Sequence, residues 1–203
     1  MKVIGITGGV GSGKSALLSY MEKTYNCKVI LADQVAHLAR VPGQPAYEKL
    51  TAVLSPGVLD EDGSINRLRM AKEIFSSTEV RQKVNEIIHP AVKDYILAKI
   101  HKGKKENKLD FLFIEAALLI EDGYLSVVDE MWYIYAKEEV RRQRLRETRN
   151  YPDERIDMII KSQLTEEQFR QACHVVIDNS GSLGEAYKQI EEALVKKEAA
   201  QER

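Results

Sequence analysis

The residues best suited to chemistry are the eight at positions 8–15, which read Gly-Gly-Val-Gly-Ser-Gly-Lys-Ser. They complete a G-x-x-x-x-G-K-[ST] loop that follows the apolar run 2–7 and leads into a helical pattern. In such a loop the glycines turn backbone N–H groups toward phosphate oxygens, and the following helix adds its positive N-terminal end. A glycine-rich turn that binds nothing is the alternative, but the Lys-Ser pair and the flanking pattern favour a triphosphate site. We expect ATP to be bound by Gly9, Gly11, Ser12, Gly13, Lys14, Ser15 and Ala16.

Within this loop, two side chains have distinct expected tasks. Lys14 supplies a point charge for the β- and γ-phosphates, and the Ser15 hydroxyl can ligate Mg²⁺. Losing the charge at position 14 is therefore expected to impair catalysis, which places Lys14 among the catalytic residues.

Three polar residues elsewhere follow, or end, candidate strands. They are Asp33, Glu115 and Asn179, and ligands of parallel sheets gather at the carboxyl ends of the strands. We expect the second strand beside the first, so that Asp33 faces the γ-phosphate and accepts the proton of an acceptor hydroxyl. The alternative, compatible with that role, is that Asp33 caps the next helix. Glu115 is either a Mg²⁺ carboxylate or a strand-end acid facing the surface.

Short apolar runs alternate with helical segments along the chain, which predicts an α/β fold with a five-stranded parallel sheet flanked by helices. Together with the phosphate-binding loop, this architecture is typical of a P-loop kinase. The runs lie at 2–7, 28–32, 109–115, 130–136 and 174–178. With 203 residues and a 44% apolar share, one domain is expected. Its parts would be a core of 1–33, 109–136 and 173–203, a helical substrate-binding insertion of 34–108 and a helical lid of 137–172.

Two features refine the insertion and the end of the chain. Helical stretches are expected near 66–76 and 79–102, with Pro90 bending or restarting the second one at His89. The charged run 102–108 is expected to be a solvated connection. From Leu183 onward, the apolar spacing predicts a helix packed on the core.

Six arginines are concentrated between positions 141 and 155. Together with the break at Asn150-Tyr151-Pro152, they suggest two helices that meet at a mobile hairpin. A lid of that form would bring an arginine over the γ-phosphate on closure and exclude water. Arg149, beside the break, is the first candidate, and Arg146 is the second.

Composition excludes several classes of protein. The net charge of −1 provides no basic field for nucleic acid or for an anionic membrane, and the absence of a leader or spanning segment suggests the cytoplasm. Cys27 and Cys173 are expected to be free, buried thiols. A formal Asn-Lys-x-Asp match occurs at 107–110, where it overlaps the charged run 102–108, and the D-x-x-G match at 60–63 is most simply a turn. A small-molecule kinase remains, either a monomer or a weak homo-oligomer.

Blocks in one order along nearly the whole chain resemble the dephospho-CoA kinase family. They are the loop with its strand, the Ala32-Asp33 segment, Asp62-Gly63-Ser64-Ile65-Asn66-Arg67, Asn85-Glu86-Ile87-Ile88-His89-Pro90 and Val176-Ile177-Asp178-Asn179. The resemblance implies ATP-dependent phosphorylation of the ribose 3′-hydroxyl of dephospho-CoA, the acceptor substrate, giving coenzyme A and ADP.

The resemblance also implies roles for individual residues. Arg67 and His89 would contact the acceptor, while Asn179 and a lid arginine would contact ATP. The alternatives are a solvated arginine at 67 and a histidine that satisfies a helix end at 89. Asn66 stands where the family often has an acidic residue, His174 stands where Asp is common, and the spacing after Arg144-Leu145 is one residue longer than usual. Other possible functions are another P-loop small-molecule kinase and an ATP-switch binding module.

Overall fold

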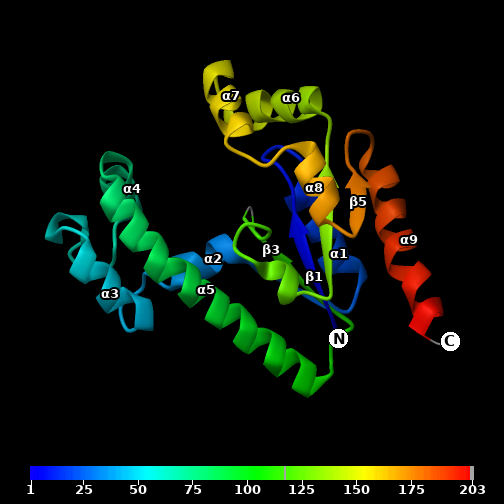
Figure 1. Cartoon of the computed structure of the whole chain (residues 1–203), viewed down its shortest axis with the longest axis horizontal. Helices are drawn as coiled ribbons and strands as arrows, with labels where there is room; N and C mark the ends of the chain where they lie inside the picture. Colours follow the sequence, from blue (N-terminus) through cyan, green and yellow to red (C-terminus); the bar gives the residue numbers. More distant parts are fainter. Residues whose placement is uncertain (117, 202–203) are drawn as a thin grey trace. The chain divides into compact units, whose positions relative to one another are not determined.

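A computed structural model describes residues 1–116 and 118–201 of the chain. Its five strands are β1 (Lys2–Thr7), β2 (Cys27–Leu31), β3 (Phe111–Glu115), β4 (Glu130–Tyr135) and β5 (Val175–Asp178). They form one sheet in the order β2-β3-β1-β4-β5 (Figure 1). β1 pairs in parallel with β3 and β4, and β4 with β5. The expected five-stranded parallel sheet is confirmed.

The place of β2 differs from the expectation. We expected the second strand beside the first, but β3 lies between β1 and β2. The side chains account for this order, because Leu112, Phe113 and Ile114 of β3 are at most 2% exposed, as a central strand requires. β2 instead carries the exposed Lys28, which suits a sheet edge.

The core of the sheet is built from large apolar side chains. Trp132 of β4 and Phe113 of β3 are fully buried, and their rings meet edge to face at 6.4 Å between centroids. The helix α1 (Lys14–Thr24) follows the loop after β1, and the terminal helix α9 (Leu183–Gln201) packs on α1 and β5. Within α9, Ala186, Ile190 and Leu194 are buried, which confirms a packed C-terminal helix.

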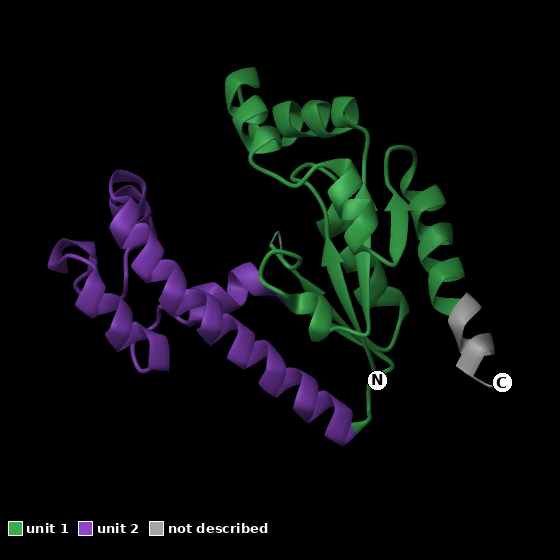
Figure 2. Ribbon diagram, in the orientation of Figure 1, with its two compact units in different colours: residues 1–29, 107–203 green, residues 30–106 purple. Residues whose placement is uncertain are grey.

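The chain divides into two compact units, coloured separately in Figure 2. The first comprises residues 1–29 and 107–203, and the second comprises residues 30–106. The first also contains η2 (Tyr124–Ser126), α6 (Glu138–Arg149), α7 (Asp153–Lys161) and α8 (Glu166–Ala172). The second contains α2 (Ala32–Leu38), α3 (Pro45–Val53), η1 (Pro56–Val58), α4 (Arg67–Ser76) and α5 (Thr78–Glu106).

The long helix α5 organises the second unit, because α2, α3 and α4 all pack against it. We expected Pro90 to bend or restart this helix at His89, and the helix is not restarted there, because α5 is continuous through Pro90. Buried Val84 lies before the proline and buried Val92, Ile96 and Ile100 lie after it. Packing on both sides therefore compensates for the hydrogen bond that proline removes.

α5 also extends beyond its expected end at 102. Residues 102–106 are helical rather than a solvated connection, and Lys102 pairs with Glu106 at 3.7 Å, one turn apart. The helix ends at Glu106, and the next residue, Asn107, has a left-handed backbone conformation with a φ of 47°.

Among the described residues, no helix is both long enough and apolar enough to cross a membrane.

Candidate active site

The loop of residues 8–13 joins β1 to α1, as the sequence predicted. Gly13 directly precedes α1 with a φ of 88°, a left-handed conformation that favours glycine. A side chain at this position would also clash with the amide of Asn179. The expected strand–loop–helix geometry of a phosphate-binding loop is therefore present.

The lysine of the loop folds back over it. Lys14 Nζ donates to the carbonyl oxygen of Gly8 at 2.7 Å and lies 3.6 Å from Oε1 of Glu115. Glu115 comes to this position because β3 pairs with β1 in a register that sets Glu115 opposite Ile6. With side chains 13% and 18% exposed, the pair occupies a partly desolvated position at the ends of two adjacent strands.

Glu115 is thus half-buried against Lys14, which contradicts the alternative of an acid that only faces the surface. The serine after the lysine, Ser15, is exposed in the first turn of α1. Among the described residues, no group of three or more His, Cys, Asp or Glu side chains could hold a metal. The Ser15 hydroxyl and the Glu115 carboxylate suit Mg²⁺, which takes one or two protein ligands and fills its other positions with water and substrate phosphates.

Asn179 connects the end of β5 to the loop. Its backbone N–H donates to Tyr135 at 2.8 Å, and its side-chain Nδ2 donates to the carbonyl oxygen of Ser12 at 2.7 Å. The residue is 1% exposed, so this contact is shielded from water. Among the described residues, Oδ1 of Asn179 and Oγ of Ser12 are buried without a hydrogen-bond partner. The polar side chains of both residues are therefore only partly satisfied by the described part of the chain.

Arg144 reaches the same carbonyl from α6. Its Nη1 donates to the oxygen of Ser12 at 3.2 Å, and its Nη2 donates to the oxygen of Asn179 at 2.9 Å. One guanidinium therefore joins α6, the segment after β5 and the loop.

Arg141 holds the loop one turn earlier on α6. Its Nε donates to the carbonyl oxygen of Val10 at 2.9 Å, and its Nη2 donates to Oε1 of Gln163. The same Gln163 oxygen accepts the Val10 N–H at 3.3 Å. Burial lowers the pKa of Arg141 from its ordinary value, although an arginine stays charged in a protein.

The sequence reasoning missed Arg141, Arg144 and Gln163. A signal existed for Arg141, which lies four residues before Leu145 and shares a helical face with this 1% exposed residue, but Arg144 directly precedes Leu145 and had no such signal. Gln163 carried no such signal, since it lies in the connection between α7 and α8.

The two arginines selected from the sequence lie at the far end of α6. Arg146 pairs with Asp153 of α7 at 2.7 Å, and both side chains are about half exposed, at 51% and 59%. Arg149 ends α6, and its guanidinium carbon lies 6.0 Å from the ring centroid of Tyr151. The expected break is confirmed, since α6 ends at Arg149, the next residue Asn150 has a φ of 50°, and α7 begins at Asp153. The roles of Arg146 and Arg149 toward phosphate stay predictions.

His174, where the family commonly has Asp, supports the sheet. Its Nδ1 accepts a hydrogen bond from the backbone N–H of Met131 at 3.0 Å, and the backbone N–H of His174 donates to the carbonyl oxygen of Met131 at 2.8 Å. This residue therefore extends the pairing of β4 and β5.

The predicted acceptor residues all belong to the second unit. Asp33 is exposed in the first turn of α2. The capping residue of α2 is Leu31, so the alternative of Asp33 as an N-cap is wrong. His89 is half-buried within α5, so the alternative of a histidine at a helix end is wrong too. The position of Asp33 toward a triphosphate held by the first unit stays a prediction.

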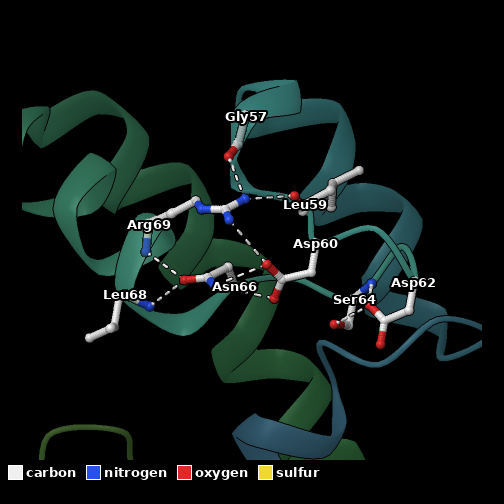
Figure 3. Close-up of polar contacts among 8 residues, drawn as sticks. All are labelled: Gly57, Leu59, Asp60, Asp62, Ser64, Asn66, Leu68 and Arg69. Atoms are coloured by element: carbon white, nitrogen blue, oxygen red, sulfur yellow. Dashed lines mark hydrogen bonds and ion pairs between the residues drawn. The ribbon is translucent and has the colours of Figure 1, made fainter.

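Arg67 is the first residue of α4, and the start of this helix is firmly held (Figure 3). Oδ1 of Asn66 accepts the N–H groups of Leu68 and Arg69, both at 3.0 Å. Its Nδ2 donates to the Asp60 carboxylate at 3.0 and 3.2 Å. An asparagine suits this position better than an acidic residue, because its amide can cap the helix and also donate to Asp60, whereas a carboxylate can only accept.

Asp60 belongs to the D-x-x-G match, and its surroundings are those of a turn. The N–H of Gly63 donates to the Asp60 oxygen at 2.9 Å, and the Asp60 N–H donates to Ser64 at 2.8 Å. The match is a turn that supports the start of α4, as expected.

A cavity of about 580 Å³ lies within the second unit. Its walls are mostly apolar and come from three helices, with Val35 and Leu38 on α2, Pro45 on α3, and Ile87 and Tyr95 on α5. The volume and lining are those of a small-molecule site.

Comparisons with known proteins agree with this geometry. The profile of the family CoaE, described as Dephospho-CoA kinase, matches residues 2–185. The Dephospho-CoA kinase of Aquifex aeolicus is 36% identical over 191 residues, covering 94% of each chain. That of Carboxydothermus hydrogenoformans is 34% identical over 190 residues, covering 94% of this chain and 91% of its own.

A solved structure supports the fold. The dephospho-CoA kinase from Campylobacter jejuni superposes with a TM-score of 0.71 at 24% identity, covering 95% of this chain and 98% of its own. Because the family profile spans most of the chain and the relatives exceed 30% identity, the chain belongs to the dephospho-CoA kinase family and is an ATP-dependent kinase.

Proposed function

We propose that this chain phosphorylates the ribose 3′-hydroxyl of dephospho-CoA with ATP, giving coenzyme A and ADP. The observation that carries the proposal is the position of Lys14 between the Gly8 carbonyl and the Glu115 carboxylate, in a chain whose residues 2–185 match the family. In the reaction, the acceptor oxygen forms a bond to the γ-phosphorus and the bond from that phosphorus to the β–γ bridging oxygen breaks.

The loop residues Gly9, Gly11, Ser12, Gly13, Lys14, Ser15 and Ala16 hold the triphosphate. Phosphoryl transfer is catalysed mainly by positioning and by stabilising negative charge. Arg141, Arg144 and Asn179 serve this end by donating to the carbonyl groups of Val10 and Ser12, which holds the backbone of the loop in place.

Ser15 and Glu115 would hold Mg²⁺ when ATP is bound, Glu115 either directly or through water. The ion would supply charge neutralisation between the β- and γ-phosphates. Lys14, which already lies beside Glu115, contributes a further positive charge at the same position.

Asp33 is the catalytic base in this proposal. Its carboxylate orients the 3′-hydroxyl and accepts its proton as the hydroxyl attacks. The exposure of Asp33 on α2 leaves the carboxylate accessible to an acceptor.

The segment 137–172 acts as a lid that excludes water, because an open site would let ATP hydrolyse. Arg149, or else Arg146, would stabilise the transferring phosphate when the lid closes. The end of α6 that carries both arginines is joined to α7 by three residues.

The second unit, 30–106, provides the acceptor site, with Arg67 and His89 as contacts. Its cavity of about 580 Å³ has mostly apolar walls that also include Lys49, Glu86 and Asp94, and it has room for the uncharged pantetheine arm. The place of action would be the cytoplasm, with the chain as a monomer or a weak homo-oligomer.

The test is ADP release measured with ATP and a panel of acceptors: dephospho-CoA, adenosine, a nucleoside monophosphate and no acceptor. ADP release that depends on dephospho-CoA supports the proposal. Equal release with the smaller acceptors would point to another small-molecule kinase, and ADP release that no acceptor stimulates would point to a switch module. Either of these results would reject it.

A further inference from the structure

One face of α2 and of the turn after it carries three polar residues of the second unit. Asp33, His37 and Arg40 follow the spacing i, i+4, i+7, which places their side chains in one row. Arg40 was not selected from the sequence.

The guanidinium of Arg40 is held in place by three neutral partners. Its Nε donates to the carbonyl oxygen of Ala36 at 3.1 Å, and its Nη2 donates to Nδ1 of His37 at 3.0 Å. Its Nη1 contacts the sulfur of Met70 at 4.0 Å. In the part of the chain that the structure describes, no carboxylate forms an ion pair with this half-buried arginine. Its orientation is thus fixed while its charge is left uncompensated by direct contact.

A second guanidinium comes to the same place from α4. Met70, which touches Arg40, lies three residues after Arg67, and residues at this spacing share a helical face. The Asn66 cap fixes the start of α4 and therefore the backbone of Arg67. Both cations act on His37. The positive charge of Arg40 is the largest cause that lowers the pKa of His37, and the charge of Arg67 is a smaller one.

The charge of the exposed Arg67 acts on Arg40, and an anion that contacts both guanidinium groups would relieve this repulsion. Asp33, the proposed base, lies on the same face of α2 and acts electrostatically on Arg40. In dephospho-CoA, the ribose that carries the reacting 3′-hydroxyl carries the pyrophosphate on its 5′ side. An acceptor whose hydroxyl reaches Asp33 therefore brings two negative charges close to it.

We propose that Arg40 and Arg67 together bind the pyrophosphate of the acceptor, with Arg40 prearranged by Ala36, His37 and Met70. The inference rests on the proposed function, since dephospho-CoA supplies the pyrophosphate. Guanidinium groups suit this ligand because their donors match phosphate oxygens in bidentate fashion. Arg40 thus selects acceptors that carry a pyrophosphate over simple nucleosides.

The experiment is a calorimetric titration of dephospho-CoA into the full chain and into Arg40→Gln, Arg40→Lys and Lys72→Gln. Lys72→Gln is the matched control, because it removes one positive charge from the exposed surface of α4, about 140° around the helix from Arg67. Loss of a charged hydrogen bond should weaken dephospho-CoA binding about 10- to 100-fold in Arg40→Gln. Arg40→Lys should lie between it and the parent, and Lys72→Gln should match the parent.

A second measurement separates binding from folding. Adenosine, used as a competitive inhibitor, has no pyrophosphate, so its inhibition constant should be the same in the parent and in Arg40→Gln. The KM for ATP should also be unchanged. Parent-like dephospho-CoA affinity in Arg40→Gln, or an equal loss of adenosine and dephospho-CoA affinity, would overturn the inference. If the parent chain itself does not bind dephospho-CoA, the proposed function fails along with it.

Discussion

The side-chain amide of Asn179 donates to the carbonyl oxygen of Ser12 over 2.7 Å, which ties the end of β5 to the loop between β1 and α1. The Ser12 oxygen also accepts a hydrogen bond from Arg144, so one carbonyl group accepts hydrogen bonds from two segments that are distant in the sequence. The shape of the loop is thus set by its neighbours as well as by its own glycines.

Asn179→Ala should lower the free energy of unfolding by about 1–3 kcal/mol, because it removes a buried hydrogen bond and leaves a cavity. It should also raise the KM for ATP, since the loop loses one of its supports. Denaturant unfolding and steady-state kinetics measure the two effects. The control is Ser180→Ala, which loses the bond from the Lys137 N–H but leaves the Ser12 contact intact. An unchanged KM for ATP in Asn179→Ala would contradict the role given to this residue.

Arg144→Gln should weaken ATP binding, because it removes two contacts that hold the loop and the Asn179 backbone. Arg146→Gln breaks only a half-exposed pair with Asp153, which is worth about 0–1 kcal/mol of stability. Titration of each variant with ATP makes the comparison. Equal ATP affinity in Arg144→Gln and the parent would refute this account of the loop.

Arg149→Ala should lower kcat with little change in ATP affinity, because the lid arginine is needed only when the lid closes over the transferring phosphate. Arg146→Ala is the matched comparison on the same helix end. Stopped-flow single turnovers measure the chemical step for each. If both variants turn over like the parent, neither residue is the lid arginine.

Asn66→Asp should destabilise the chain by about 1–2 kcal/mol, because a carboxylate at this position would oppose that of Asp60. The swap Asn66→Asp with Asp60→Asn should recover most of the loss, since an amide and a carboxylate again face each other. Thermal unfolding of the single and double variants gives the comparison. A double variant less stable than Asn66→Asp would show that the pair is not the cause.

Cys27 and Cys173 are free, as expected, but half-buried rather than buried, and they provide a test that depends on pH. Burial raises the pKa of Cys27 to about 11 and that of Cys173 to about 12, so at pH 8 each forms less thiolate than an unfolded cysteine. Alkylation by iodoacetamide should be slow in the folded chain and fast in denaturant. Because unfolded thiols ionise first as the pH rises above about 8.5, these groups also make the folded chain less stable at alkaline pH. Rapid labelling of the native chain at pH 8 would show that burial does not protect the thiols.

Much of the fold could be predicted, because its strands are apolar runs with turns at their ends. Strand order could not be predicted in this way, since it depends on which strand is buried on both faces. The exposed Lys28 identifies β2 as an edge strand only when β2 is compared with the wholly apolar Leu112–Ile114 of β3. The continuity of α5 was missed because local rules weigh Pro90 alone, whereas buried residues on both sides of it hold the helix together.

The loop, Lys14 and Glu115 could be predicted because their spacing carries the chemistry. Arg141 could have been selected by its spacing from the buried Leu145, but Arg144 could not be separated from the neighbouring arginines, because its role depends on contacts with Ser12 and Asn179 far away in the sequence. Arg40 offered no motif at all, because its position depends on contact with Met70, thirty residues away along the chain.

The central claim is that the carboxylate at position 33 accepts the proton of the acceptor hydroxyl. The measurement is dephospho-CoA-dependent ADP release by the parent chain and by Asp33→Asn, with ATP affinity measured on both. Loss of a general base typically lowers turnover about 10²- to 10⁴-fold, so the account predicts a fall in kcat of that size with ATP affinity retained. Turnover by Asp33→Asn within a few-fold of the parent would contradict it.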